Sequence, residues 1–78
     1  MNNRIVSNPK ILGGKPCIKE TRIAVYMVLE LVETGISFSE ICTKYYPQLS
    51  RQDIKACIAY ARHIVQNEDI HLVSEHAA

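Results

Sequence analysis

The chain has 78 residues, of which 47% are apolar and 22% are charged, and its formal net charge is +1. This balance is typical of one small globular domain and excludes a wholly disordered chain, and because a core of this size contributes only about 3–5 kcal/mol, we expect oligomerisation. No apolar run reaches the roughly 18 residues that a membrane span requires, and the N-terminus lacks a signal-peptide core, so we expect a cytoplasmic protein.

Charge and pattern divide the chain into three parts: an extended N-terminal arm (residues 1–23), a three-helix domain (24–66) and an acidic C-terminal tail (67–78). The first 22 residues carry five Lys or Arg and a single acid, Glu20. The tail carries Glu68, Asp69 and Glu75 and no Lys or Arg. Such asymmetry suggests different partners for the two ends, although charge is also an ordinary way to solvate a terminus.

Two short strands or extended segments are predicted in the arm, at residues 4–7 and 17–23. The turn residues Asn8, Pro9, Gly13 and Gly14 lie between them. An isolated hairpin is marginal in water, so we expect it to lie on the first helix or to pair with a second copy.

The GGKPC stretch from Gly13 to Cys17 suggests a phosphate loop or a nucleophile, and neither interpretation is favoured. It lacks the GxxxxGK[ST] spacing, and Pro16 cannot donate an amide. Cys17 has no histidine base nearby in the sequence. We expect the glycines to adopt positive φ in a turn, and we expect no catalytic residue.

The three cysteines, Cys17, Cys42 and Cys57, have no CxxC pairing and are odd in number, so three free thiols are predicted. The histidines, His63, His71 and His76, have no partners at metal-ligand spacing. No metal or cofactor is expected.

A first helix is predicted over residues 24–34, with Gly35 at its C′ position. Its apolar positions repeat at helical spacing, namely Val25, Val28, Leu29 and Val32.

A second helix is predicted from the N-cap Ser37, with Glu40 at N3, to about Tyr46, before Pro47. Its expected buried face is Phe38, Ile41, Cys42 and Tyr45.

A third helix is predicted from Arg51 to about Gln66, with Ser50 as N-cap and Asp53 at N3. Its expected inner face is Ile54, Cys57, Ile58, Ala61, Ile64 and Val65. A short turn joins the second and third helices, so the fold class expected is all-α: a three-helix bundle of helix-turn-helix type with a short N-terminal β arm.

The segments GGKPCIK, TRI with a following V, YMVLEL and LSRQDIKACIAYA resemble the bacterial family called domain of unknown function 433 over residues 4–66. The family usually has Gly at the position of Glu20 and Pro at that of Ala24. Loss of that Gly weakens the expectation of a positive-φ turn at Glu20. The resemblance implies a homeodomain-like fold and, for many members, a role as antitoxin beside a PIN-like ribonuclease toxin.

Opposite the inner face of the third helix, a polar arc of roughly 100° carries the candidate DNA-binding residues. They are Arg51, Gln52, Lys55 and Arg62. On the second helix of a helix-turn-helix pair, the first three would meet base edges and Arg62 would hold phosphate. The alternative is an ordinary solvated helix face.

The tail contains one apolar run, residues 70–73, and its candidate partner-binding residues are Ile70, Leu72 and Val73. Such a segment could order on a toxin, or it could be a frayed helix end or a strand closing a dimer. The function expected is therefore a non-enzymatic, homodimeric antitoxin that binds operator DNA and a ribonuclease toxin. The alternatives are a protein-interaction module without DNA binding and a small enzyme using Cys17.

Overall fold

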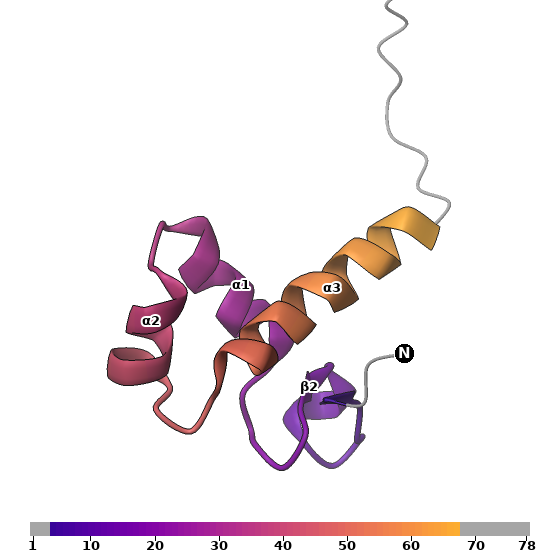
Figure 1. Cartoon of the computed structure of the whole chain (residues 1–78). Helices are drawn as coiled ribbons and strands as arrows, with labels where there is room; N and C mark the ends of the chain where they lie inside the picture. The colour runs from indigo at the N-terminus through magenta and orange to yellow at the C-terminus, as the bar shows by residue number, and fades with distance from the viewer. Residues whose placement is uncertain (1–3, 68–78) are drawn as a thin grey trace, which may run out of the picture.

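The structure, a computed structural model, describes residues 4–67 (Figure 1). These residues form two short strands, β1 (Ile5–Val6) and β2 (Cys17–Ile18), with a 3₁₀ turn η1 (Leu12–Gly14) between them. The helices that follow are α1 (Val25–Glu33), α2 (Phe38–Glu40), a π-helical turn η2 (Ile41–Tyr45) that continues α2, and α3 (Arg51–Asn67). The described chain is therefore mostly helical with a small antiparallel sheet.

The N-terminal arm is a two-stranded hairpin, as the sequence predicts. Ile5 pairs with Ile18 and Val6 with Cys17, and the Lys19 amide donates to the Arg4 carbonyl at 2.8 Å. β1 packs against α3, whereas the first helix was the expected support, and Ile5 and Ile18 contact the core. Burial against helices stabilises a hairpin that would be marginal alone.

The turn before β2 confirms the structural interpretation of the glycine pair. Gly13 has φ +62° and Gly14 has φ +87°, a region that residues with a Cβ rarely adopt. Leu12, with φ +53°, shares this conformation. Lys15 and Lys19 are exposed, whereas Cys17 is 1% exposed, so its side chain belongs to the core.

The end of α1 is set by Gly35, as predicted. Gly35, at φ +90°, donates to the Val32 carbonyl, and Ile36 donates to the Leu31 carbonyl, both at 3.0 Å. These two bonds form a Schellman motif, which satisfies the last carbonyls of the helix.

The second helix begins as predicted but does not keep α-helical spacing. The Glu40 amide donates to Ser37 Oγ at 3.1 Å, which confirms the N-cap. At the other end, the Tyr46 amide donates to the Ile41 carbonyl at 2.7 Å, an i to i−5 bond. This wider turn brings Tyr46 against the core and leaves Tyr45 47% exposed, so the prediction of Tyr45 as a buried residue is wrong.

The core lies where the first half of α3 crosses α1, α2 and the arm. Val28, Ile41, Ile54 and Cys57 are each fully buried. All three cysteines are free thiols, as predicted, and burial, with a smaller effect of the Asp53 charge, raises the pKa of Cys57 to about 12.

The second half of α3 extends beyond the other helices (Figure 1). Ile64 is 39% exposed and Val65 is 66% exposed, so their predicted burial is wrong. Their spacing identifies the apolar side of α3, but no described element covers its last turns. Within residues 4–67, no helix is both long and apolar enough to cross a membrane.

Candidate nucleic-acid interface

The first turn of α3 is fixed by a reciprocal capping box between Ser50 and Asp53. The Asp53 amide donates to Ser50 Oγ at 3.3 Å, and the Ser50 amide donates to Asp53 Oδ2 at 2.9 Å. These bonds satisfy amides that the helix itself leaves unpaired and so determine where α3 begins. The start of α3 in turn determines the direction of the side chains that follow.

The four predicted DNA-binding residues all lie on the exposed side of α3, and we call this set the cationic face: Arg51, Gln52, Lys55 and Arg62. Arg51 and Arg62 are eleven positions apart, or about 16 Å along a helix. The face therefore presents three cations and one amide along a single exposed stripe.

Two of the cationic side chains are restrained by uncharged neighbours, which do not neutralise the positive charge. The Arg51 guanidinium lies 5.4 Å from the centroid of the Phe38 ring, a cation–π contact that joins α3 to α2. Arg62 Nη1 donates to Gln66 Oε1 at 2.8 Å, one turn along α3. A stacked guanidinium keeps its edge N–H groups available to acceptors, and one bond to Gln66 uses a single donor of Arg62.

No described carboxylate neutralises the cationic face. The ion pairs among residues 4–67 join Arg4 to Asp53 and Lys44 to Glu40, at 3.0 and 3.6 Å. Asp53 is the one acid on α3, and it is 9% exposed. The charge of Arg51, Lys55 and Arg62 is therefore available to an anionic ligand.

Asp53 also binds the N-terminal arm, a contact that the sequence analysis missed. Arg4 Nη1 donates to Asp53 Oδ1 at 3.0 Å across 49 positions of the chain. Burial alone would raise the pKa of the Asp53 carboxyl, but hydrogen bonds from Ser50 and Arg4 together with the Arg4 charge hold it below its ordinary value. The Asp53 carboxylate thus stays ionised and pins the arm to α3.

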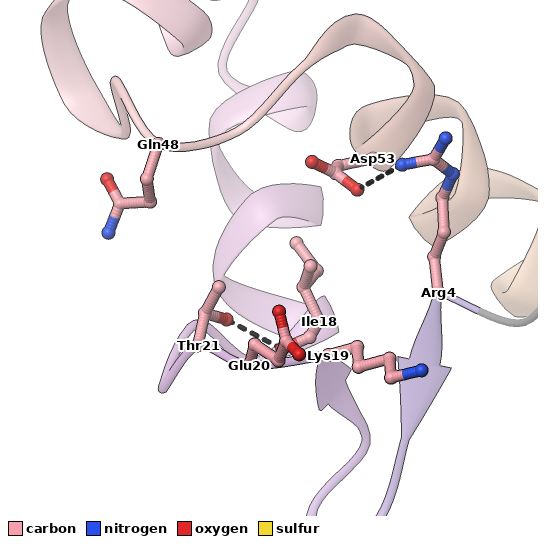
Figure 2. A pocket seen from close by; sticks show the side chains of 7 residues that line it. All are labelled: Arg4, Ile18, Lys19, Glu20, Thr21, Gln48 and Asp53. Atoms are coloured by element: carbon pink, nitrogen blue, oxygen red, sulfur yellow. Dashed lines mark hydrogen bonds and ion pairs between the residues drawn. The ribbon is translucent and has the colours of Figure 1, made fainter.

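An open recess of about 580 Å³ lies next to this ion pair (Figure 2). Arg4 and Asp53 border one side, Gln48 stands opposite, and Glu20 and Thr21 lie along the turn after β2. The Thr21 hydroxyl donates to the Ile18 carbonyl at 2.8 Å and accepts from the Ile23 amide at 3.0 Å, so its role is to hold the turn.

Glu20 occupies this turn with φ +65°. The positive-φ turn is therefore present, although the loss of the family's usual Gly had weakened the expectation of it. Side chains with a Cβ pay an energetic cost in this region. The turn thus keeps a glycine-like conformation without a glycine.

The predicted partner-binding residues, Ile70, Leu72 and Val73, lie outside the described residues. The exposed end of α3 adds an apolar feature that the sequence analysis assigned to the core. Ile58, Ala61 and Val65 line a groove bordered by Arg62 and Gln66, and we call these three residues the α3 strip.

Comparisons with known proteins identify a family and a solved relative. The family described as protein of unknown function, DUF433, matches residues 5–61. A crystal structure of a DUF433 member protein from Anabaena variabilis superposes with a TM-score of 0.70 at 31% sequence identity. The match covers 83% of this chain and 60% of that one, so this chain spans less than two thirds of that protein's length. No curated protein matches the chain.

Proposed function

The chain belongs to the DUF433 family, and resemblance to this family implies an antitoxin role for many members. We therefore propose that it is a non-enzymatic, DNA-binding antitoxin of homeodomain-like helix-turn-helix type. The observation that carries the proposal is the cationic face: three exposed cations on one side of α3, unpaired with any carboxylate of residues 4–67. In this proposal α2 with η2 is the first helix of the motif and α3 is the recognition helix.

The order of residues along α3 suits a recognition helix. Arg51, Gln52 and Lys55 lie in its first two turns, where a recognition helix contacts base edges in the major groove. Arginine and lysine pair with guanine O6 and N7, and glutamine pairs with adenine. Arg62, about 16 Å farther along, contacts phosphate and sets the orientation of the helix.

The whole chain's charge makes a dimer the effective DNA-binding species. A net charge of +1 is low for a protein that binds DNA as a single copy. A homodimer presents two cationic faces to two half-sites and doubles the number of phosphate contacts. Binding of DNA by a homodimer is therefore part of the proposal.

The second partner in this proposal is a PIN-like ribonuclease toxin, bound through Ile70, Leu72 and Val73. An apolar segment between acids suits a nucleic-acid-cleaving enzyme, whose surface is basic around its substrate. Catalysis is not part of the proposal, because Cys17, the nucleophile considered, is 1% exposed.

A mobility-shift titration of the DNA upstream of the gene tests the DNA-binding role. We expect the wild-type chain to shift this DNA at low salt and a Lys55→Ala/Arg62→Ala variant to lose at least tenfold in affinity. Lys10→Ala, which removes an exposed cation from the loop before η1, is the matched control and should bind like the wild type. Equal mobility of the wild type and the double variant would reject the proposal.

A protein-interaction module without DNA binding is the second candidate, and the α3 strip favours it. Apolar side chains at the end of a projecting helix are typical of a protein-docking surface. Under this alternative neither the wild type nor the double variant shifts DNA at low salt, and the double variant weakens a complex with an acidic protein partner. The mobility shift of the wild-type chain at low salt therefore distinguishes the two candidates.

A further inference from the structure

The α3 strip is an apolar surface without cover from any described element. Val65 is 66% exposed, and Ile58 and Ala61 are half-buried beside it in the groove. Exposed apolar area of this kind is stabilised when another apolar surface covers it. A segment able to reach the strip and complement its surroundings would therefore be held there.

The surroundings of the strip are basic. From residue 54 to 67, α3 carries Lys55 and Arg62 and no acid. The segment that follows α3, residues 68–78, has the opposite character: three acids, no Lys or Arg, and one apolar run. It begins one residue after the end of α3, so its local concentration at the strip is high.

We propose that residues 68–78 fold back along α3 of the same chain, so that Ile70 and Leu72 cover the α3 strip and Glu75 lies beside Lys55. The inference goes beyond the proposed function and does not rest on it. If both hold, the folded-back segment is the state of the free chain, and it must leave α3 before Ile70 and Leu72 bind a toxin and Lys55 contacts DNA.

The lengths agree with this placement. In an extended segment at about 3.3 Å per residue, Ile70 and Leu72 point to the same side about 7 Å apart. Val65 and Ala61, four residues apart on a helix, are about 6 Å apart. With Ile70 at Val65, Glu75 lies about 16 Å farther along, and Lys55 lies about 15 Å back along α3. In this placement Glu68 and Asp69 form the turn at which the chain reverses its direction.

A second copy is the competing occupant, and charge argues against it. Two α3 strips brought together would place Lys55 and Arg62 of both copies near one interface that contains no acid of α3 other than the buried Asp53. Like charges across an interface oppose association. The acidic segment relieves the same charge that a second α3 would increase.

Methyl NMR of the full chain, labelled at Ile, Leu and Val, tests the placement. We expect nuclear Overhauser contacts from Ile70 and Leu72 to Val65 and Ile58 that persist on dilution. Val65→Ser should abolish them and shift the amide resonances of residues 70–73, while His63→Ser, on another side of α3, should leave them unchanged. Unchanged methyl signals of the buried Ile41 and Ile54 verify that each variant is folded.

The charge contact has its own test. Lys55→Glu and Glu75→Lys should each weaken the contacts, and the double exchange should restore them. Absence of contacts in the wild type overturns the proposal, as do contacts found only between differently labelled copies. Neither readout requires DNA, so loss of the DNA-binding proposal would leave this test intact.

Discussion

Asp53 joins the first turn of α3 to the N-terminal arm. Its carboxylate accepts from the Ser50 amide and from Arg4, and its side chain is 13% exposed. Burying this charge is compensated because each of its oxygens has a donor. One residue therefore sets both the start of the candidate recognition helix and the position of the hairpin.

The lowered pKa of Asp53 predicts a pH-dependent contribution to stability. A carboxyl whose pKa is lower in the folded state stabilises the fold above its unfolded pKa and loses this contribution as pH falls through the folded pKa. Asp53→Asn keeps an oxygen that can accept from the amide of the N-cap residue Ser50 but removes the charge. It should lower the free energy of unfolding by about 1 kcal/mol at pH 7, a modest effect because Arg4 is half exposed. Urea titrations from pH 7 to pH 3 measure this difference.

The difference between wild type and Asp53→Asn should stay constant above about pH 5 and shrink below about pH 4. Arg4→Gln is the matched control, because it removes the same ion pair from the other side. A difference that is as large at pH 3 as at pH 7 would contradict the assigned role of the charge.

Glu20 predicts a stabilising substitution. Its φ of +65° is costly for a side chain with a Cβ, so Glu20→Gly should raise the free energy of unfolding by about 1 kcal/mol. Glu20→Ala removes the same carboxylate and keeps the strain, so it should change stability little. Thermal unfolding of both variants checks the prediction, and equal behaviour of Gly and Ala at this position would count against strain in the turn.

At the scale of elements, the starts and ends of helices were predictable because local chemistry fixes them. Ser37 and Ser50 cap the helices that follow them, and Gly35 ends α1. The π-helical turn was not predictable, since Tyr45 and Tyr46 are identical in chemistry and tertiary packing selects which one is buried. Similarly, the spacing of Ile64 and Val65 indicates an apolar side and not whether a neighbour covers it.

The π-helical turn predicts different effects for two adjacent, identical residues. Tyr46→Ala removes a side chain packed on the core and should lower the free energy of unfolding by about 2 kcal/mol. Tyr45→Ala removes an exposed ring and should cost less than about 0.5 kcal/mol. Chemical denaturation of both variants checks this, and the opposite order would indicate a regular α-helix with Tyr45 inward.

At the scale of the whole molecule, the sequence predicted three helices, a short β arm and the exposure of the cationic face. Helical periodicity places Arg51, Lys55 and Arg62 on the side opposite Ile54 and Cys57, which are buried. The contact between Arg4 and Asp53 joins positions 49 apart and has no local signal. The packing of the hairpin on α3 also joins positions far apart in the sequence, so local patterns did not predict it.

Binding of DNA phosphates and bases by the cationic face of α3 is the prediction on which the proposed function depends most. Fluorescence anisotropy with upstream DNA, titrated from low to physiological salt, measures how many cations contact phosphate, because each one contributes about 0.9 to the slope of log K against log salt. We predict that replacing Arg51, Lys55 and Arg62 by alanine weakens binding and lowers the magnitude of this slope by about 1 per bound chain, because only Arg62 is assigned to phosphate, while Lys10→Ala leaves both unchanged. Equal slopes for the wild type and the triple variant would contradict this prediction.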